Sequence, residues 1–133
     1  MDKEKIVFTN GCFDMIHRGH IELLKFCSQL GKKVIVGLNS DESVKKLKGD
    51  NRPVNSQEDR KILLESIRYV NSVIVFKEDT PYNLIKSLKP DIIVKGGDYN
   101  PEDVVGKDLA EVKIFKYVEG YSTSKTIQDI TNR

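Results

Sequence analysis

The sequence predicts an α/β fold in which a parallel β-sheet is covered by helices on both faces. Five apolar, β-rich runs alternate along the chain with segments whose apolar residues recur at helical spacing. The run Lys33–Asn39 (KVIVGLN) is almost continuously apolar, which is typical of a strand buried on both sides. Because neither an internal repeat nor a linker interrupts the 133 residues, we expect one domain over residues 1–133.

The predicted strands are residues 5–10, Lys33–Asn39, Ser72–Phe76, 91–95 and 112–118. A first helix is expected over Arg18–Leu30, where apolar residues repeat every three to four positions, and Gly31 is a typical helix stop. Ser40 or Asp41 is expected to cap a short second helix that runs to Leu47. A polar loop of about ten residues follows (KLKGDNRPVN), and its length suggests a function.

The third and fourth helices are predicted from the residues at their N-termini. Ser56 with Asp59 resembles a capping box. The apolar side of this third helix is expected to carry Ile62, Leu63, Ile67 and Val70. Thr80 as N-cap and Pro81 as the first helical residue begin the fourth helix, which is expected to end near Lys89. The C-terminal stretch GYSTSKTIQDI is expected to form a loop and a short helix.

Composition limits the classes of function. The chain has 22 Lys and Arg against 20 Asp and Glu, so its net charge of +2 gives no general support for binding nucleic acid or a membrane surface. No apolar run reaches the roughly 20 residues that span a bilayer, and the charged N-terminus does not resemble a signal peptide. Cys12 and Cys27 lack the spacing of a paired motif, so we expect a reduced, cytoplasmic protein.

The polar motifs of the sequence follow predicted strands. TNGCFDMIHRGH follows the first strand, NSDESVKKLKG the second, KGGDY the fourth and GYSTS the fifth. Right-handed crossovers bring the carboxyl ends of parallel strands to one edge of a sheet, and ligands bind there, where the strand order reverses. We therefore expect these four loops to converge on a ligand site.

The first motif holds both histidines of the chain, His17 and His20, at the predicted start of a helix. Three residues are just under one turn, so both imidazoles lie on one helix face. The N–H groups and dipole of a helix N-terminus attract anions. Gly11 permits a sharp turn, and Gly19 permits close approach of a ligand to the backbone. The pattern favours a phosphate site.

Two other interpretations of the histidines remain open. His20 could extend the apolar stripe of the helix, with His17 as a surface residue. A metal could also be held by His17, His20, Cys12 or Asp14, but the spacing matches no standard zinc pattern, so no metal ligand is assigned to a protein side chain.

Further candidates lie in the later loops. Lys45, Lys46 and Lys48 are either solvated or, in part, available to neutralise phosphate charge. Arg60 lies in the first turns of the third helix, where a cation gains nothing from the helix dipole, so it either faces a ligand or, as Arg68 also could, forms a surface ion pair. Gly96, Gly97 and Asp98 form either a plain turn or a backbone approach to a nucleotide, with Asp98 on a sugar or a metal. Ser122, Thr123 and Ser124 are either N-caps or donors to a base or phosphate.

These motifs together resemble the nucleotidyltransferases that carry a His-x-Gly-His motif, a superfamily that includes the cytidylyltransferases. The similar stretches are TNGCFDMIHRGHIELL, LNSDESVKKLKGDNRPVN, EDTPYNLIKSLKPDIIVKGGDY and GYSTSKTI, which cover nearly the whole chain. LKGDNRPVN and VKGGDY are the more specific, and they resemble the heptose adenylyltransferase branch. The resemblance implies a Rossmann-like five-stranded sheet and a reaction of ATP with a heptose 1-phosphate, giving ADP-heptose and pyrophosphate for lipopolysaccharide or another surface glycan.

The resemblance also implies roles for particular residues. His17 and His20 would contact the nucleotide phosphates, and Lys48 would reach a phosphate. With the candidates above, the predicted nucleotide-binding residues are Thr9, Asn10, Gly11, Phe13, Gly19, Lys45, Arg60, Gly96, Asp98, Ser122 and Thr123. The expected cofactor is Mg²⁺ with ATP, and the expected partners are ATP, a sugar 1-phosphate and a second copy of the chain, with neither nucleic acid nor membrane.

The sequence departs from its relatives in two respects. The kinase half found beside the heptose adenylyltransferase is absent, so we expect another protein to supply the sugar phosphate. Tyr117 stands where glycerol-3-phosphate cytidylyltransferases have an arginine, which disfavours that alternative. A non-catalytic nucleotide-binding regulator and a tRNA-binding fragment are the alternatives from other classes.

Overall fold

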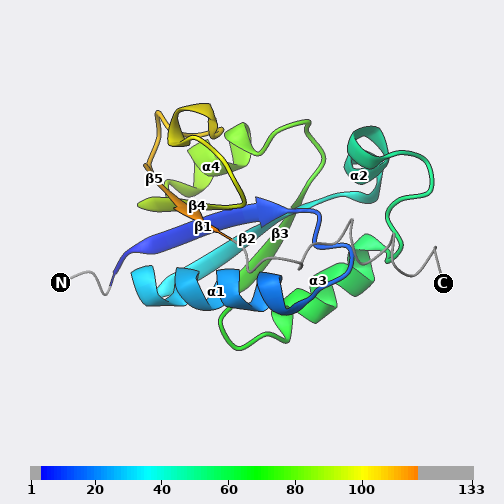
Figure 1. Ribbon diagram of the computed structural model, residues 1–133, viewed down its shortest axis with the longest axis horizontal. Helices are drawn as coiled ribbons and strands as arrows, with labels where there is room; N and C mark the ends of the chain where they lie inside the picture. The colour runs from blue at the N-terminus through cyan, green and yellow to red at the C-terminus, as the bar shows by residue number, and fades with distance from the viewer. Residues whose placement is uncertain (1–3, 117–133) are drawn as a thin grey trace.

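The computed structural model describes residues 4–116, which fold around one parallel five-stranded sheet with the strand order β3-β2-β1-β4-β5 (Figure 1). The strands are β1 (Ile6–Gly11), β2 (Lys33–Asn39), β3 (Ser72–Phe76), β4 (Ile92–Gly96) and β5 (Glu111–Phe115). The predicted fold class, a Rossmann-like α/β sheet with helices on both faces, is confirmed. All strands lie within a few residues of their predicted positions.

The strand order places β1 at the centre of the sheet, between β2 and β4. Val7 and Phe8 pair with Ile92 and Ile93 of β4, while β1 pairs along its full length with β2. The chain crosses from the β3 side of the sheet to the β4 side, so the order reverses between β1 and β4. In open α/β sheets this position, at the carboxyl ends of the strands, is where a ligand crevice forms.

The helices cover the two faces of the sheet. On one face, α1 (Arg18–Leu30) and α3 (Gln57–Glu65) pack side chains such as Leu24 and Leu64 against the sheet. On the other face, α4 (Tyr82–Leu88) contributes Ile85 to a second apolar cluster. Figure 1 shows α1 and α3 together on one side, with α4 and the short turn Pro101–Asp103 on the opposite side.

The caps predicted from sequence are present at α2 (Asp41–Lys48) and at α3. The Ser40 hydroxyl accepts the Ser43 N–H at 3.2 Å, and the Ser56 hydroxyl accepts the Asp59 N–H at 3.2 Å. At α4, Pro81 is the N-cap rather than the first helical residue. Ser40 and Ser56 fix the starts of α2 and α3, because each satisfies a backbone donor that a helix start leaves open, and Ser56 directly follows the predicted polar loop.

The expected apolar side of α3 is wrong in part. The helix ends at Glu65, and Ile62 and Leu63 are 60% and 49% exposed. The side that faces the interior carries Arg60 and Leu64, which are four residues apart and both fully buried. A buried arginine breaks the apolar periodicity, so the pattern points to the wrong face of the helix. The expectations for Tyr117, Ser122 and Thr123 lie outside the described residues. No described helix is both long and apolar enough to cross a bilayer.

Candidate functional site

A pocket of about 590 Å³ opens at the carboxyl edge of the sheet, within the size range of small-molecule sites. Segments that follow four strands line it. The β1–α1 segment contributes Asn10, Gly11, Cys12, Phe13, His17 and His20. The segment after β2 adds Lys48 and Arg52, the end of β4 and the loop after it add Lys95, Gly96 and Tyr99, and the segment after β3 adds Asp79, Thr80 and Pro81. The loops after β1, β2 and β4 therefore converge as expected, and the β3 segment is an addition that the sequence did not suggest.

The two histidines form the N-terminal cap of α1. Nδ1 of His17 accepts the Gly19 N–H at 3.0 Å, and Nδ1 of His20 accepts the His17 N–H at 3.2 Å. The two rings stack with their centroids 3.9 Å apart and an interplanar angle of 22°. Because each Nδ1 accepts a hydrogen bond, the proton of each neutral ring lies on Nε2.

Both imidazoles are neutral at pH 7. Burial lowers the pKa of His17. Burial, reinforced by the neighbouring His17, lowers the pKa of His20 to about 3. His20 is 8% exposed and also lines the pocket, so it belongs to both the interior and the site. The pair can therefore donate hydrogen bonds from Nε2 without carrying a positive charge.

The turn between β1 and α1 is shaped by Phe13. Its φ of 44° lies in the left-handed region, which is rare for a bulky residue, and its buried ring lies 5.0 Å from the His20 ring between centroids. A Cβ at position 11 would approach the Phe13 ring to 3.1 Å, so Gly11 leaves room for this ring. The Phe13 ring thus packs against the His20 ring, and the Phe13 side chain is part of the hydrophobic core.

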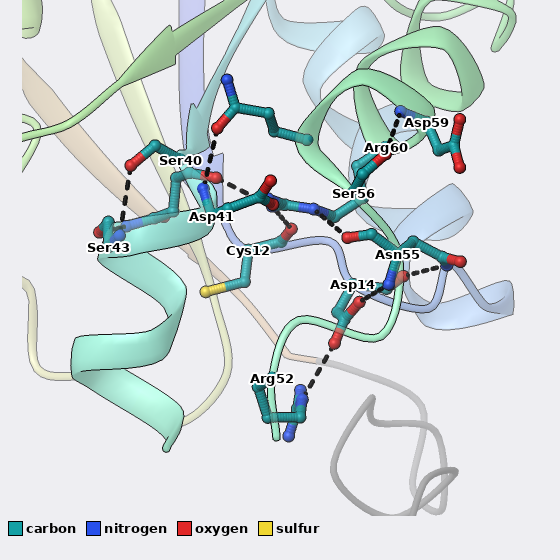
Figure 2. Close-up of polar contacts among 12 residues, drawn as sticks. Cys12, Asp14, Ser40, Asp41, Ser43, Arg52, Asn55, Ser56, Asp59 and Arg60 are labelled. Atoms are coloured by element: carbon teal, nitrogen blue, oxygen red, sulfur yellow. Dashed lines mark hydrogen bonds and ion pairs between the residues drawn. The ribbon is translucent and has the colours of Figure 1, made fainter. Parts of the chain in front are cut away.

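Asp14 fastens the β1–α1 loop to the loop between α2 and α3 (Figure 2). Its buried carboxylate accepts the N–H groups of Val54 and Asn55 at 2.8 and 2.9 Å and Nε–H of Arg52 at 2.9 Å. The Asn55 side chain in turn donates to the Asp14 carbonyl at 2.7 Å. Burial alone would raise the pKa of Asp14, but these hydrogen bonds and the Arg52 charge outweigh it and hold the pKa below its ordinary value.

Arg52 and Lys95 are pocket cations that the sequence analysis did not single out. The Arg52 side chain is 10% exposed, and one of its terminal nitrogens, Nη2, is buried with no hydrogen-bond partner in the described part of the chain. Leaving a buried donor unpaired costs about 1–3 kcal/mol. Burial lowers the pKa of Lys95, the nearby Cys12 raises it and Lys48 lowers it further. This part of the pocket is therefore suited to an anion.

Four predicted site residues lie near the pocket without lining it. The Lys45 and Asp98 side chains are exposed, and Gly19 is buried in the first turn of α1. Thr9 is fully buried in β1, one residue before the pocket wall.

Arg60 does not face the pocket, which corrects the interpretation of this residue as ligand-facing. Its guanidinium is fully buried and donates to the carbonyls of Cys12, Asn39 and Asn55 at 2.7, 2.9 and 3.0 Å. It also pairs with the Asp41 carboxylate at 2.8 Å (Figure 2). Arg60 is therefore a structural link between the loops that follow β1 and β2.

A protein-held metal site finds no support in residues 4–116, where no group of three or more His, Cys, Asp or Glu side chains is placed to hold an ion. The carboxylate of Asp14 is already occupied by hydrogen bonds. Burial raises the pKa of the Cys12 thiol, although the nearby Lys48, Arg60 and Arg52 act against it, so the sulfur is protonated and a poor ligand.

Comparisons with known proteins agree with this geometry. The Cytidylyltransferase-like family matches residues 8–128. Bifunctional protein HldE of Aliarcobacter butzleri is 54% identical over 128 residues, 96% of this chain and 27% of that protein. HldE of Nitratiruptor sp. is 56% identical over 126 residues, 94% of this chain and 27% of that protein. This chain thus spans about a quarter of the length of these curated relatives.

Solved structures resemble the chain over most of its length. The lipopolysaccharide core biosynthesis protein of Thermoplasma volcanium has 27% identity and a TM-score of 0.72, covering 89% of this chain and 98% of its own. Pantothenate synthetase of Thermus thermophilus has 16% identity and a TM-score of 0.61, covering 87% of this chain and 57% of its own, and it shares the fold alone. On the match of the family over residues 8–128, the chain belongs to the cytidylyltransferase-like family.

Proposed function

We propose that the protein is a nucleotidyltransferase that transfers AMP from ATP to a heptose 1-phosphate, releasing pyrophosphate and forming ADP-heptose. The observation that carries this proposal is the stacked pair His17 and His20, whose Nε2–H groups belong to a pocket that also holds lysine and arginine side chains. The identity to HldE proteins and the likeness to a lipopolysaccharide core biosynthesis protein support a sugar phosphate as acceptor.

In the proposed reaction, an oxygen of the sugar phosphate attacks the α-phosphorus of ATP. The new P–O bond forms as the bond between the α-phosphorus and the bridging oxygen breaks, and pyrophosphate leaves with the electron pair. His17 and His20 donate from Nε2 to the phosphate oxygens that gain negative charge. Lys48 and Lys95 neutralise the departing pyrophosphate. No protein nucleophile is needed, which agrees with a Cys12 thiol whose pKa is raised by burial.

A divalent metal, which we expect to be Mg²⁺, would enter with ATP. The donor set fits an ion held by the phosphates and water, because the described residues offer no cluster of side-chain ligands and only the isolated carboxylate of Asp79 lines the pocket. Such an ion supplies charge neutralisation to the triphosphate.

We also propose that the protein is a cytoplasmic homodimer. Ile62 and Leu63 are exposed on α3, and Leu63 borders an apolar groove with Met15, Ile16, Ile21 and Ile67. Exposed apolar patches of this kind often mark interaction surfaces. A second copy of the chain would bury this patch. The cytoplasmic location is proposed because ATP is the proposed substrate.

The test is a pyrophosphate-release assay with ATP, CTP and GTP, each offered with heptose 1-phosphate or glycerol 3-phosphate. We expect release from ATP with heptose 1-phosphate, and loss of release when Mg²⁺ is chelated. Release only from CTP with glycerol 3-phosphate would identify a cytidylyltransferase instead. Binding of ATP without release from any pair would identify a non-catalytic regulator.

A further inference from the structure

Arg52 is held in the pocket wall with part of its guanidinium unused. Its Nε–H is occupied by Asp14 at 2.9 Å, whereas the buried Nη2 has no partner in the described residues. Buried donors are nearly always hydrogen-bonded in folded proteins, and an exception needs an explanation. A ligand atom that completes the hydrogen bonding of this guanidinium is the explanation that its position in the pocket wall suggests.

The orientation of Arg52 is fixed before any ligand binds. Asp14 receives Nε–H of Arg52 and the backbone N–H groups of Val54 and Asn55, and Asn55 donates back to the Asp14 carbonyl. Asp14 lies three residues before His17, so the same carboxylate joins the loop of Arg52 to the loop of the histidines. The guanidinium therefore cannot turn away from the pocket without breaking its hydrogen bond and ion pair to Asp14.

The chemistry of a guanidinium selects the ligand. Its planar fork matches two oxygens of a phosphate, whereas a lysine acts as a point charge. The proposed reaction brings together two anions that repel each other, a triphosphate and the monophosphate of the acceptor. The histidines at the start of α1, with Lys48 and Lys95, offer donors for the triphosphate. Arg52 comes from a different loop and can grip two oxygens of a phosphate monoester, leaving the third free to attack.

We propose that Arg52 binds the phosphate of the acceptor, and that Asp14 is the residue that positions Arg52. This inference rests on the proposed function and deepens it, because it assigns a separate subsite to the sugar 1-phosphate. Arg52 is then a specificity-determining residue that requires a phosphate monoester, and Asp14 contributes to acceptor binding by positioning it.

The test compares wild type, Arg52→Lys, Arg52→Gln and the control Arg18→Lys in steady-state assays that vary ATP and heptose 1-phosphate separately. Arg18 is a matched control because its side chain is 67% exposed and pairs with Glu22 on the surface of α1. In Arg52→Lys and Arg52→Gln we expect the KM for heptose 1-phosphate to rise at least about tenfold, with the KM for ATP within about twofold of wild type. Arg18→Lys should leave both constants unchanged.

A second measurement removes turnover from the test. Heptose 1-phosphate is titrated by calorimetry into protein saturated with α,β-methylene ATP, and Arg52→Lys should weaken its binding by a similar factor. Arg52→Lys keeps a cation beside Asp14, so it carries the test if Arg52→Gln does not fold. If folded Arg52→Lys keeps the wild-type KM and affinity for heptose 1-phosphate, or if only the KM for ATP rises, the assignment of Arg52 is wrong and the proposed function still stands. A wild-type protein that releases no pyrophosphate overturns the proposed function itself, and the acceptor subsite with it.

Discussion

The imidazole rings of His17 and His20 stack 3.9 Å apart between centroids, and each ring accepts a backbone N–H through Nδ1. This arrangement gives the pair two separate duties. The Nδ1 atoms hold the first turn of α1 together, and in the proposed reaction the Nε2–H groups are the donors to the phosphates. The two duties are separable by substitution, because asparagine resembles the Nδ1 edge of histidine and glutamine reaches further, toward the Nε2 position.

Replacing His17 by Asn tests the donor duty. Asn is a favourable N-cap and keeps an acceptor for the Gly19 N–H, but it removes the Nε2–H donor. We expect kcat for pyrophosphate release to fall by about 10²–10³, with the melting temperature close to that of wild type. His20→Asn should show a similar loss. His17→Gln, which loses the cap, should be less stable than His17→Asn. Normal turnover in a folded His17→Asn would show that this ring does not act on the phosphates.

The pH dependence of stability follows from the lowered pKa of His20. In the unfolded chain a histidine takes up a proton near pH 6.5, whereas His20 in the folded protein stays neutral down to about pH 3. Between these pH values the unfolded state binds more protons than the folded state. The contribution of His20 to the free energy of unfolding is therefore complete above pH 6.5 and decreases as the pH falls. The limiting slope is about 1.4 kcal/mol per pH unit, or about 2 kcal/mol between pH 6.5 and 5.

Urea unfolding at pH 5.0 to 7.5 measures this slope in wild type and in His20→Asn. The chain has only two histidines, and His17, whose pKa burial also lowers, contributes to the slope in both proteins, so the difference between the two slopes reports His20. The slope should flatten in His20→Asn. Equal slopes in the two proteins would mean that His20 titrates alike in the folded and unfolded states.

Arg60→Met should destabilise the protein strongly. The substitution removes donors from the carbonyls of Cys12, Asn39 and Asn55 and the partner of Asp41, and it leaves buried acceptors unpaired. Breaking a buried charged network of this kind costs about 3–5 kcal/mol. Arg68→Met is the matched control, because Arg68 is exposed and its loss should cost less than about 0.5 kcal/mol. Chemical denaturation measures the free energy of unfolding of both variants. Equal losses of stability in Arg60→Met and Arg68→Met would show that Arg60 does not link the loops.

The apolar groove beside α3 predicts a change in oligomeric state. Leu63→Lys should leave the fold intact, because Leu63 is 49% exposed, but it should convert the proposed dimer to a monomer in light-scattering measurements. Asn83→Lys adds the same charge on α4, which covers the opposite face of the sheet, and should leave the mass unchanged. A wild-type monomer, or a dimer that survives Leu63→Lys, argues against this interface.

Much of the fold could be predicted because its signals are local. The buried strands are continuous apolar runs, and Ser40 and Ser56 announce helix starts through their own hydroxyls. The core-facing side of α3 could not be predicted, because Arg60 occupies it. An arginine is buried only when acceptors surround it, and its acceptors come from residues distant in sequence.

The residues of the candidate site could likewise be predicted where their sequence signal is local, and not where it depends on distant residues. His17 and His20 stand out because their spacing and the nearby glycines are visible in a few residues. Arg52 was missed because its position depends on Asp14, 38 residues away, and no local spacing reveals such a pair. Lys95 did leave a signal, since a lysine at the end of the apolar strand DIIVK is a charge where a buried strand would avoid one.

The grip of Arg60 on main-chain carbonyls has a consequence for how the pocket can vary. Cys12, Asn39 and Asn55 each offer a peptide oxygen, which every amino acid possesses, so replacing their side chains leaves the anchor in place. The hydrogen bonds from Arg60 to these three carbonyls therefore do not depend on which side chains the residues carry. Redesigning this enzyme for another base or another acceptor can thus exchange other pocket side chains, provided that Arg60 is kept together with the loop contacts of Asp14 and Asn55.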